Sequence, residues 1–276
     1  MIDPIQLSTI VRRALQEDIG AGDVTSTWTI PTGRTGCGVL LCKAEGVLAG
    51  LQVAGEVFAQ VSVDLKVQAK SDGDPIVPGD RIATVQGLMT AILTAERTAL
   101  NLLQRMSGIA TMTRRYVEAV AGTKAVILDT RKTVPGLRLI DKWAVRTGGG
   151  QNHRMRLDDM VLIKDNHIAA SGGITCAVER VRKHDVQGLP IEVEVKTWAQ
   201  LEEAVPLQLD RIMLDNMSLD EMRRAVGWVA GRVPLEASGG ITLDTVRAVA
   251  ETGVDYISVG ALTHSVIALD ISLEVE

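Results

Sequence analysis

Short apolar runs alternate with amphipathic stretches through the second half of the chain, beginning after Gly122. Each run has three to five residues and ends in a charged residue, a serine or a glycine. Patterns with helical spacing, such as Leu219–Val229 and Leu243–Glu251, separate the later runs. Strands joined by crossover helices form parallel sheets, so we predict an α/β fold with an incomplete or distorted barrel. The six runs are 125–128, 160–163, 191–195, 211–214, 235–237 and 256–259.

The first half of the chain has a different pattern. Apolar residues on one helical face between Ile5 and Leu15 predict a short amphipathic helix, and segment 36–87 has strand-like runs separated by Gly and Pro. From Leu88 to Val120 the spacing is helical again, and Ser107–Gly108 interrupts it, which predicts two helices and a nearby domain boundary. Residues 268–276 alternate apolar and polar side chains, so we expect a strand that returns to the first domain's sheet.

Composition and charge exclude several classes of protein. The chain of 276 residues is 46% hydrophobic but only 3% aromatic, so aliphatic side chains fill the predicted core. A net charge of -5 argues against a general nucleic-acid-binding protein. No apolar run approaches the roughly 20 residues that span a bilayer. The three cysteines lack metal-site spacing and the N-terminal segment lacks a signal-like apolar core, which favours a cytoplasmic location.

A basic segment stands out against this acidic background, between Ile127 and His167. Cations crowded at the ends of strands indicate an anion held among them, because arginine grips carboxylate or phosphate in two places. For three of these residues, spaced by four, a solvated helix face is the better interpretation. The cations between the two strands are Arg131, Lys132, Arg138, Lys142, Arg146, His153, Arg154 and Arg156, the spaced three being Arg138, Lys142 and Arg146.

Acidic residues follow two of the later strands. In barrels of this kind, catalytic groups lie at the C-terminal ends of the strands. Glu194 and Asp215 end neighbouring strands, where two carboxylates could hold Mg²⁺ through water and phosphate or could bind ribose hydroxyls. Glu192 has the same side-chain parity as Glu194, so spacing alone does not decide which of them faces a ligand.

Glycine-rich loops follow the last two strands, at Ser238–Gly239–Gly240 and at Gly260–Ala261. Glycines let backbone amides approach a phosphate, and helix N-termini favour its charge. Plain tight turns are the alternative. Together with the cations and acids, the loops predict a site for a phosphorylated sugar, a metal ion and a polyanionic partner.

These residues lie in motifs that closely resemble the quinolinate phosphoribosyltransferase family, over nearly the whole chain. No motif position departs from the family pattern. The motifs are Glu17–Asp18 with Gly22–Asp23–Val24–Thr25; Glu96–Arg97–Thr98–Ala99–Leu100–Asn101; Ser107–Gly108–Ile109–Ala110–Thr111; Asp129–Thr130–Arg131–Lys132–Thr133 with Pro135–Gly136–Leu137–Arg138; Gly148–Gly149–Gly150 with Asn152–His153–Arg154; Leu162–Ile163–Lys164–Asp165–Asn166–His167; Glu192–Val193–Glu194–Val195; Met213–Leu214–Asp215–Asn216; and Ser238–Gly239–Gly240.

The resemblance implies a fold with two domains. An N-terminal α/β open-faced sandwich would comprise residues 1–107 and the tail 267–276, and an incomplete α/β barrel of six to seven strands would comprise residues 108–266. It further implies a homodimer, or a higher assembly of dimers, in which Arg97 enters the partner's active site. On spacing alone, Arg97 belongs to a polar helix stripe, so this role comes from the resemblance.

The resemblance also implies the reaction and its residues. A pentosyltransferase of this family joins quinolinate to phosphoribosyl pyrophosphate with Mg²⁺ as cofactor, and releases nicotinate mononucleotide, pyrophosphate and carbon dioxide. Lys132, Lys164, Glu194 and Asp215 would be catalytic, with Glu194 and Asp215 also holding Mg²⁺. The implied quinolinate ligands are Arg97, Thr130, Arg131, Lys132, His153, Arg154 and Lys164. The implied phosphoribosyl pyrophosphate ligands are Lys132, Glu194, Asp215, Ser238, Gly239, Gly240, Gly260 and His264.

Three other functions stay open at this point. A related protein associated with molybdate transport shares the Arg-Lys-Thr and Gly-Gly-Gly-His-Arg stretches, but the intact run 162–167 favours the quinolinate enzyme. A catalytically silent sensor of pyridine dicarboxylates or phosphosugars would not need both Glu194 and Asp215. Barrel aldolases and isomerases usually need a base or a Schiff-base lysine in an apolar pocket, whereas Lys164 stands among charged residues.

Overall fold

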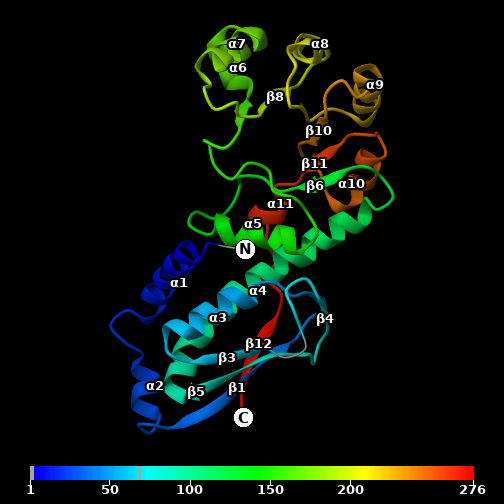
Figure 1. Cartoon of the computed structure of the whole chain (residues 1–276). Coiled ribbons are helices and arrows are strands. Elements are labelled where there is room, and N and C mark those ends of the chain that lie inside the picture. Colours follow the sequence, from blue (N-terminus) through cyan, green and yellow to red (C-terminus); the bar gives the residue numbers. More distant parts are fainter. Residues whose placement is uncertain (1–2, 68–69) are drawn as a thin grey trace. The chain divides into compact units, whose positions relative to one another are not determined.

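The computed structural model describes residues 3–67 and 70–276. Its contacts divide the chain into two compact units, which are described separately (Figure 1). Unit 1 comprises Met1–Arg114, Thr133–Gly149 and Leu262–Glu276, and unit 2 comprises Arg115–Lys132 and Gly150–Ala261. The domain boundary predicted at residue 107 falls inside a helix and stays a prediction.

An antiparallel sheet with strand order β12-β1-β5-β3 forms the centre of unit 1. Leu40 of β1 lies opposite Leu273 of β12, so the C-terminal tail does return to this sheet, as its alternating pattern predicted. Leu40 and Ile82 are fully buried on the covered face. The strands are β1 (Thr35–Cys42), β3 (Asp64–Val67), β5 (Arg81–Leu88) and β12 (Ile271–Val275), and a separate pair joins β2 (Gly46–Val47) to β4 (Pro75–Ile76).

Short helices complete unit 1. The predicted opening helix is α1 (Pro4–Ile19), which Asp3 caps by accepting from the Ile5 N–H. Its buried face is Leu7, Val11 and Leu15, whereas Ile5 is 78% exposed, because the face repeats every four residues from Leu7. The other helices are α2 (Val24–Thr29), α3 (Leu51–Gln60), α5 (Arg138–Thr147) and α11 (Ala261–His264), the last beginning one residue before unit 1 resumes.

Helix α4 (Met89–Ala119) corrects one prediction, because it runs for 31 residues without a break at Ser107–Gly108. Both small residues serve packing instead. The Ser107 hydroxyl accepts from the Ala49 N–H at 3.0 Å and donates to the Ala49 carbonyl at 3.2 Å. A Cβ at Gly108 would lie 2.1 Å from the Ile267 carbonyl oxygen, so only glycine allows this approach. None of the described helices is long and apolar enough to cross a membrane.

Unit 2 contains the predicted parallel sheet, with strand order β6-β11-β10-β9-β8-β7. All six expected strands are present, and within the described residues β6 and β7 form its two edges, as in an open barrel. The strands are β6 (Val126–Leu128), β7 (Val161–Ile163), β8 (Ile191–Val195), β9 (Arg211–Asp215), β10 (Leu235–Ser238) and β11 (Tyr256–Ser258). The helices are α6 (Asp165–Ser171), α7 (Ile174–His184), α8 (Trp198–Ala204), η1 (Val205–Leu207), α9 (Leu219–Val229) and α10 (Leu243–Ala250).

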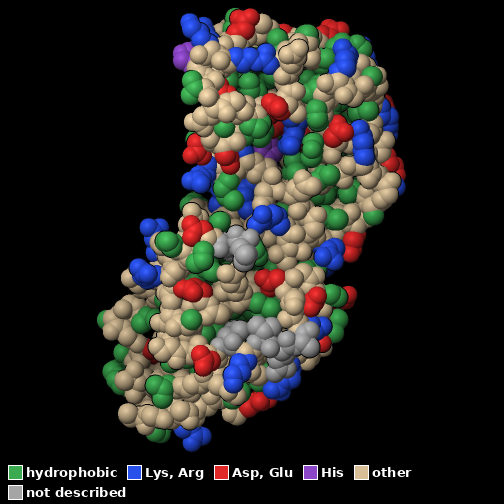
Figure 2. All heavy atoms as spheres, in the orientation of Figure 1, with side chains coloured by type: hydrophobic (Ala, Val, Ile, Leu, Met, Phe, Trp, Pro, Cys, Tyr) green, Lys and Arg blue, Asp and Glu red, His purple; other side chains and the backbone are tan. Residues whose placement is uncertain are grey.

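Charged side chains of both signs are scattered over the face seen in the space-filling view (Figure 2). That face offers no broad surface of one sign to a polyanion. Cations that the sequence singled out instead line a pocket at the ends of the strands of unit 2.

Candidate active site

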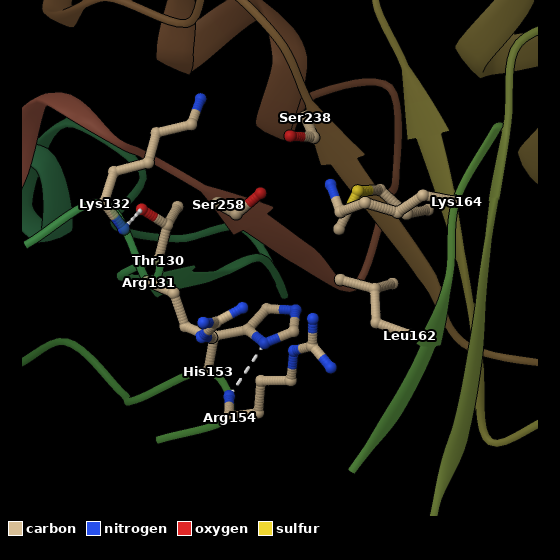
Figure 3. A pocket seen from close by; sticks show the side chains of 10 residues that line it. Thr130, Arg131, Lys132, His153, Arg154, Leu162, Lys164, Ser238 and Ser258 are labelled. Atoms are coloured by element: carbon tan, nitrogen blue, oxygen red, sulfur yellow. Dashed lines mark hydrogen bonds between the residues drawn. The ribbon is translucent and has the colours of Figure 1, made fainter. Parts of the chain in front are cut away.

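A cavity of about 310 Å³ lies at the C-terminal ends of the strands of unit 2. Figure 3 shows Thr130 and Lys164 on opposite sides of this cavity, with Ser238 and Ser258 between them. Seven of its ten lining residues are among those predicted from the sequence to bind a ligand. The lining is Thr130, Arg131, Lys132, His153, Arg154, Leu162, Lys164, Met213, Ser238 and Ser258.

Four cationic side chains reach this cavity from three chain segments. Arg131 and Lys132 follow β6, Arg154 belongs to the loop before β7, and Lys164 follows β7. Burial lowers the pKa of Arg154, and the neighbouring Arg131 charge lowers it further. Like charges held this close repel each other, so binding of an anionic ligand would reduce the electrostatic repulsion among these side chains.

The buried Asp129 side chain holds the loop that carries His153 and Arg154. Its Oδ1 accepts from the His153 backbone N–H at 2.9 Å, and its Oδ2 accepts from the Asn152 amide at 2.6 Å. The Arg154 guanidinium donates to the Met160 carbonyl at 3.1 Å. The loop is therefore tied to the end of β6 and to the start of β7.

The other cations of the basic segment belong to α5 in unit 1. Arg146 is exposed and lies over the Trp143 ring, 5.1 Å from its centroid, which agrees with a solvated helix face. Lys142, in contrast, is fully buried, so that interpretation is wrong for it. Its neighbour Asp141 is also buried and pairs with Arg105 at 2.8 Å. Helical spacing alone could not show that this face of α5 packs inside unit 1.

The two predicted acids, Glu194 and Asp215, contact the lysines that follow β7 and β8, of which Lys164 lines the cavity; these four residues are called the rim. Lys164 Nζ donates to Glu194 Oε2 at 2.8 Å. Lys196 Nζ lies 4.0 Å from Glu194 Oε1 and 3.7 Å from Asp215 Oδ2, and it donates to Asp165 at 2.7 Å. One ammonium group therefore stands within reach of both acids. Lys196 was not among the predicted site residues, although it follows β8 directly, as Lys164 follows β7.

These two carboxylates fit a hard divalent cation. Both offer oxygen donors, and the fold already places a positive group, the Lys196 ammonium, within 4.0 Å of each. Mg²⁺ keeps several waters and is usually held by one or two carboxylates and substrate phosphates. Two carboxylates suit an ion that is also coordinated by water and substrate phosphate better than an ion coordinated by protein side chains alone.

A second acidic layer lies deeper, under the cavity. Glu192 and Glu236 are both fully buried, and His153 Nε2 lies 3.0 Å from Glu192 Oε2 and 3.7 Å from Glu236 Oε2. Arg211 of β9 donates to Glu236 at 2.7 Å. Burial raises the pKa of both carboxyl groups to about 7. Glu194 thus contacts the cavity residue Lys164, whereas Glu192 lies beside His153, and which of the two faces the substrate stays a prediction.

Glu236 was not among the site residues predicted from the sequence. It stands inside a run interpreted as apolar, 235–237, and an acid at an inward position of a buried strand was the signal that could have revealed it. Charged residues are rarely buried without a partner. Met213 and Ser258 also line the cavity without having been predicted, because neither residue type signals a ligand on its own.

The loop after β10 needs its glycines for conformation. Gly239 has φ of 103° and Gly240 has φ of 60°, both in the left-handed region. A Cβ at Gly239 would lie 2.2 Å from the Asn216 side-chain oxygen. These backbone constraints explain why both positions are glycine. Phosphate binding by this loop, by Gly260 or by His264 stays a prediction. His264 and Arg97 belong to unit 1, so their predicted roles are not tested by the cavity of unit 2.

Comparison with known proteins places the chain in a family. The family model described as quinolinate phosphoribosyl transferase, N-terminal domain, matches residues 23–107, and the corresponding C-terminal domain model matches residues 109–274. Together these matches cover most of the chain. The protein belongs to the quinolinate phosphoribosyltransferase family.

Relatives of this family match over almost the full length. A probable nicotinate-nucleotide pyrophosphorylase (carboxylating) from Bacillus subtilis is 44% identical, over 98% of this chain and 94% of its own. A chloroplastic nicotinate-nucleotide pyrophosphorylase (carboxylating) from Oryza sativa subsp. japonica is 46% identical, over 98% of this chain and 78% of its own. The resemblance inferred from the motifs is thus confirmed.

A solved structure supports the fold. The nicotinate-nucleotide pyrophosphorylase from Francisella tularensis is 40% identical, with a TM-score of 0.95 over 100% of this chain and 98% of its own. The predicted α/β fold of a quinolinate phosphoribosyltransferase is therefore confirmed. The roles of individual residues, the metal ion and the assembly are not tested by these likenesses.

Proposed function

We propose that this enzyme transfers the phosphoribosyl group of phosphoribosyl pyrophosphate to quinolinate and removes one carboxyl group, in the de novo synthesis of NAD. The products would be nicotinate mononucleotide, pyrophosphate and carbon dioxide. The observation that carries the proposal is a cavity lined by four cationic side chains in a member of this family. Quinolinate has two carboxylates, and such a cluster suits a dianion.

In this proposal the walls of the cavity orient quinolinate. Arg131 and Arg154 present planar guanidinium groups that can each grip a carboxylate at two atoms, and Lys164 supplies a further positive charge. Lys132 extends away from the cluster of Arg131 and His153 in Figure 3, a position suited to pyrophosphate or to the far edge of quinolinate. Orientation of this kind removes most of the entropy cost of bringing two substrates together.

Glu194 and Asp215 would act on the ribose. As the C1–O bond to pyrophosphate breaks, positive charge builds on the ribose ring, and two carboxylates at the rim stabilise that charge. When bound, Mg²⁺ neutralises the charge that develops on the leaving pyrophosphate. Lys164 donates to Glu194, and Lys196 lies 3.7 Å from Asp215, so both acids are held in place before the substrates arrive.

Decarboxylation needs no further cofactor in this scheme. The quinolinate nitrogen donates its electron pair to C1 of the ribose and becomes cationic. The bond between the ring and the adjacent carboxylate then breaks, its electron pair is stabilised by the cationic ring, carbon dioxide leaves and a proton takes its place. The task of the protein would be orientation and electrostatics rather than covalent catalysis.

A turnover assay tests the reaction. Purified protein with quinolinate, phosphoribosyl pyrophosphate and Mg²⁺ should release carbon dioxide and form nicotinate mononucleotide. Turnover of nicotinate in place of quinolinate would overturn the proposal, and binding of quinolinate without any turnover would favour a sensor. Omission of Mg²⁺ with a chelator should abolish product formation if the metal proposal is correct.

The proposed assembly is a homodimer, or a higher assembly of dimers, in which Arg97 completes the partner's site. At quinolinate concentrations well below the wild-type KM, Arg97→Ala and Arg131→Ala should each be nearly inactive. Mixing and refolding them together should restore about a quarter of wild-type activity, because half of the dimers would be mixed and each would carry one intact site. No recovery, with mixed dimers demonstrated, would place Arg97 in its own subunit's site or in none. A cytoplasmic location is proposed with this function, in keeping with three free cysteines.

A further inference from the structure

The acidic layer beneath the cavity has oxygens that the proposed reaction does not use. Glu192 Oε2 lies 3.0 Å from His153 Nε2, and the Oε1 atoms of Glu192 and Glu236 are buried among these side chains. One ligand atom from each of Glu192, Glu236 and His153 lies within 4.8 Å of the others. Burying a carboxyl group costs free energy unless it is compensated by a partner. The presence of two such groups, Glu192 on β8 and Glu236 on β10, therefore calls for an explanation.

The hydrogen bonds of His153 indicate that reason. The Arg154 backbone N–H donates to His153 Nδ1 at 2.7 Å, which assigns the lone pair of the ring to Nδ1. In the neutral ring the proton is then on Nε2, the atom that faces Glu192 at 3.0 Å and Glu236 at 3.7 Å. A carboxylate beside an imidazole N–H selects this tautomer and fixes the plane of the ring.

A metal ion is the other candidate occupant, but it fits the same atoms poorly. A histidine ligand must offer a lone pair, and with Nδ1 engaged by a backbone N–H, the Nε2 atom carries hydrogen instead. Arg211 already donates to Glu236 Oε2 at 2.7 Å, the oxygen nearest to His153. A divalent ion would also add positive charge below a cavity that holds four cations.

A series of side-chain contacts connects Arg211, on β9, to the cavity residues His153 and Arg154. Arg211, whose guanidinium also lies over the Tyr256 ring at 4.0 Å, holds Glu236. Glu236 and Glu192 face His153 Nε2, and His153 Nδ1 holds the backbone of Arg154. Asp129 fixes the same loop from the opposite side. His153 and Arg154 are both lining residues of the cavity.

We infer that Glu192 and Glu236 are positioning residues, which hold the His153 ring and, through it, the Arg154 backbone in the geometry that binds the dicarboxylate. The inference rests on the proposed function, because it concerns the quinolinate half of that site. The His153 ring then has a fixed orientation, while Arg131, Arg154 and Lys164 provide positive charge. Glu192 and Glu236 do not touch the substrate and are not catalytic residues.

Substitution of Glu192 tests the inference with matched variants. Glu192→Leu removes the carboxyl group, Glu192→Gln keeps an oxygen that accepts from Nε2–H, and Glu251→Leu on α10 removes an exposed glutamate as the control. Leucine at a buried glutamate position often preserves folding, and thermal melts check this. In calorimetric titrations, Glu192→Leu should bind quinolinate about tenfold more weakly or worse, while Glu192→Gln and Glu251→Leu stay within about threefold of wild type.

The two substrates separate a positioning role from a general loss of structure. For Glu192→Leu, KM for phosphoribosyl pyrophosphate at saturating quinolinate should stay within about threefold of wild type. Equal weakening of both substrates, or unchanged quinolinate binding in Glu192→Leu, would overturn the inference. Loss of binding in Glu192→Gln as severe as in Glu192→Leu would also overturn it.

Ring ¹⁵N spectra of the unliganded wild-type protein supply a readout that needs neither a variant nor activity. His153 should show a protonated Nε2 and an unprotonated Nδ1. The opposite tautomer, or a doubly protonated ring at neutral pH, would contradict the assignment. Should wild-type protein fail to bind quinolinate, the proposed function falls, while the spectra still decide whether the acidic layer sets the tautomer of His153.

Discussion

Glu194 and Glu192 lie two residues apart on β8, with side chains on the same side of the sheet, yet their surroundings differ. Glu194 stands at the rim, where it accepts from Lys164 and lies near Lys196. Glu192 stands one layer below, fully buried, beside His153 and Glu236. The same residue type on the same strand can thus face a ligand or support a neighbouring side chain, depending only on its depth in the barrel.

The depth has an electrostatic consequence. Glu194 is buried like Glu192, but it accepts from Lys164 and lies near Lys196. In the layer below, burial raises the pKa of Glu192 and Glu236 to about 7, and Arg211 pairs with Glu236. We therefore expect Glu194 to act through its charge, and Glu192 and Glu236 to act by orienting His153.

Glu194→Gln should have the largest effect. The amide preserves shape but removes the negative charge proposed to stabilise the ribose in the transition state, so kcat should fall by about two orders of magnitude or more. Thermal stability should fall modestly, because the buried Glu194 loses its ionic contact with Lys164 while glutamine keeps an acceptor oxygen. Steady-state kinetics and a melting curve measure both quantities, and a variant with normal kcat would remove Glu194 from the proposed catalytic groups.

Arg131→Ala should weaken quinolinate by about one to two orders of magnitude, as expected for loss of a two-point grip on a carboxylate. Phosphoribosyl pyrophosphate should be affected far less. Arg131→Lys should recover only part of the loss, since an ammonium group cannot make both contacts. Binding titrations with each substrate decide the matter, and equal losses for both would contradict the assignment.

Glu236→Ala should destabilise the fold by about 3 kcal/mol, because it leaves the partly buried Arg211 side chain, which is 20% exposed, without its carboxylate. The exposed pair Arg247–Glu251 is a matched control, since its N···O distance is 2.6 Å against 2.7 Å for Arg211–Glu236. Glu251→Ala should change stability too little to measure in the same denaturant titration. Comparable losses in both variants would mean that burial does not distinguish the two pairs.

The smallest effect concerns pH. Since the folded-state pKa of Glu236 is raised to about 7 from 4.5, the folded protein binds the proton more tightly than the unfolded chain does. Stability from this group is complete below about pH 4.5 and is lost as the pH rises to about 7, by about 1 to 3 kcal/mol. Glu236→Gln should flatten that slope in denaturant titrations between pH 5 and pH 8, and an unchanged slope would assign it to other groups.

Much of unit 2 could be predicted, because its strands are short apolar runs that end in charged residues. Arg131 and Lys164 were recognised for that reason, and the structure places both at the cavity. Ser107–Gly108 shows the limit of such patterns, since small residues can mark close packing as well as a break in a helix. Lys142 shows the same limit, because spacing along a helix does not say which face another element covers.

The amino-acid sequence by itself determined the βα order, the family motifs and the cations of the candidate site, because these depend on local periodicity and on residue types at strand ends. Only the tertiary structure decided that Glu194 stands above Glu192, that Glu236 on another strand joins Glu192 beside His153, and that Lys196 reaches both rim acids. Depth in a barrel and contact across strands depend on the register of parallel neighbours, which residues far apart in the chain establish together.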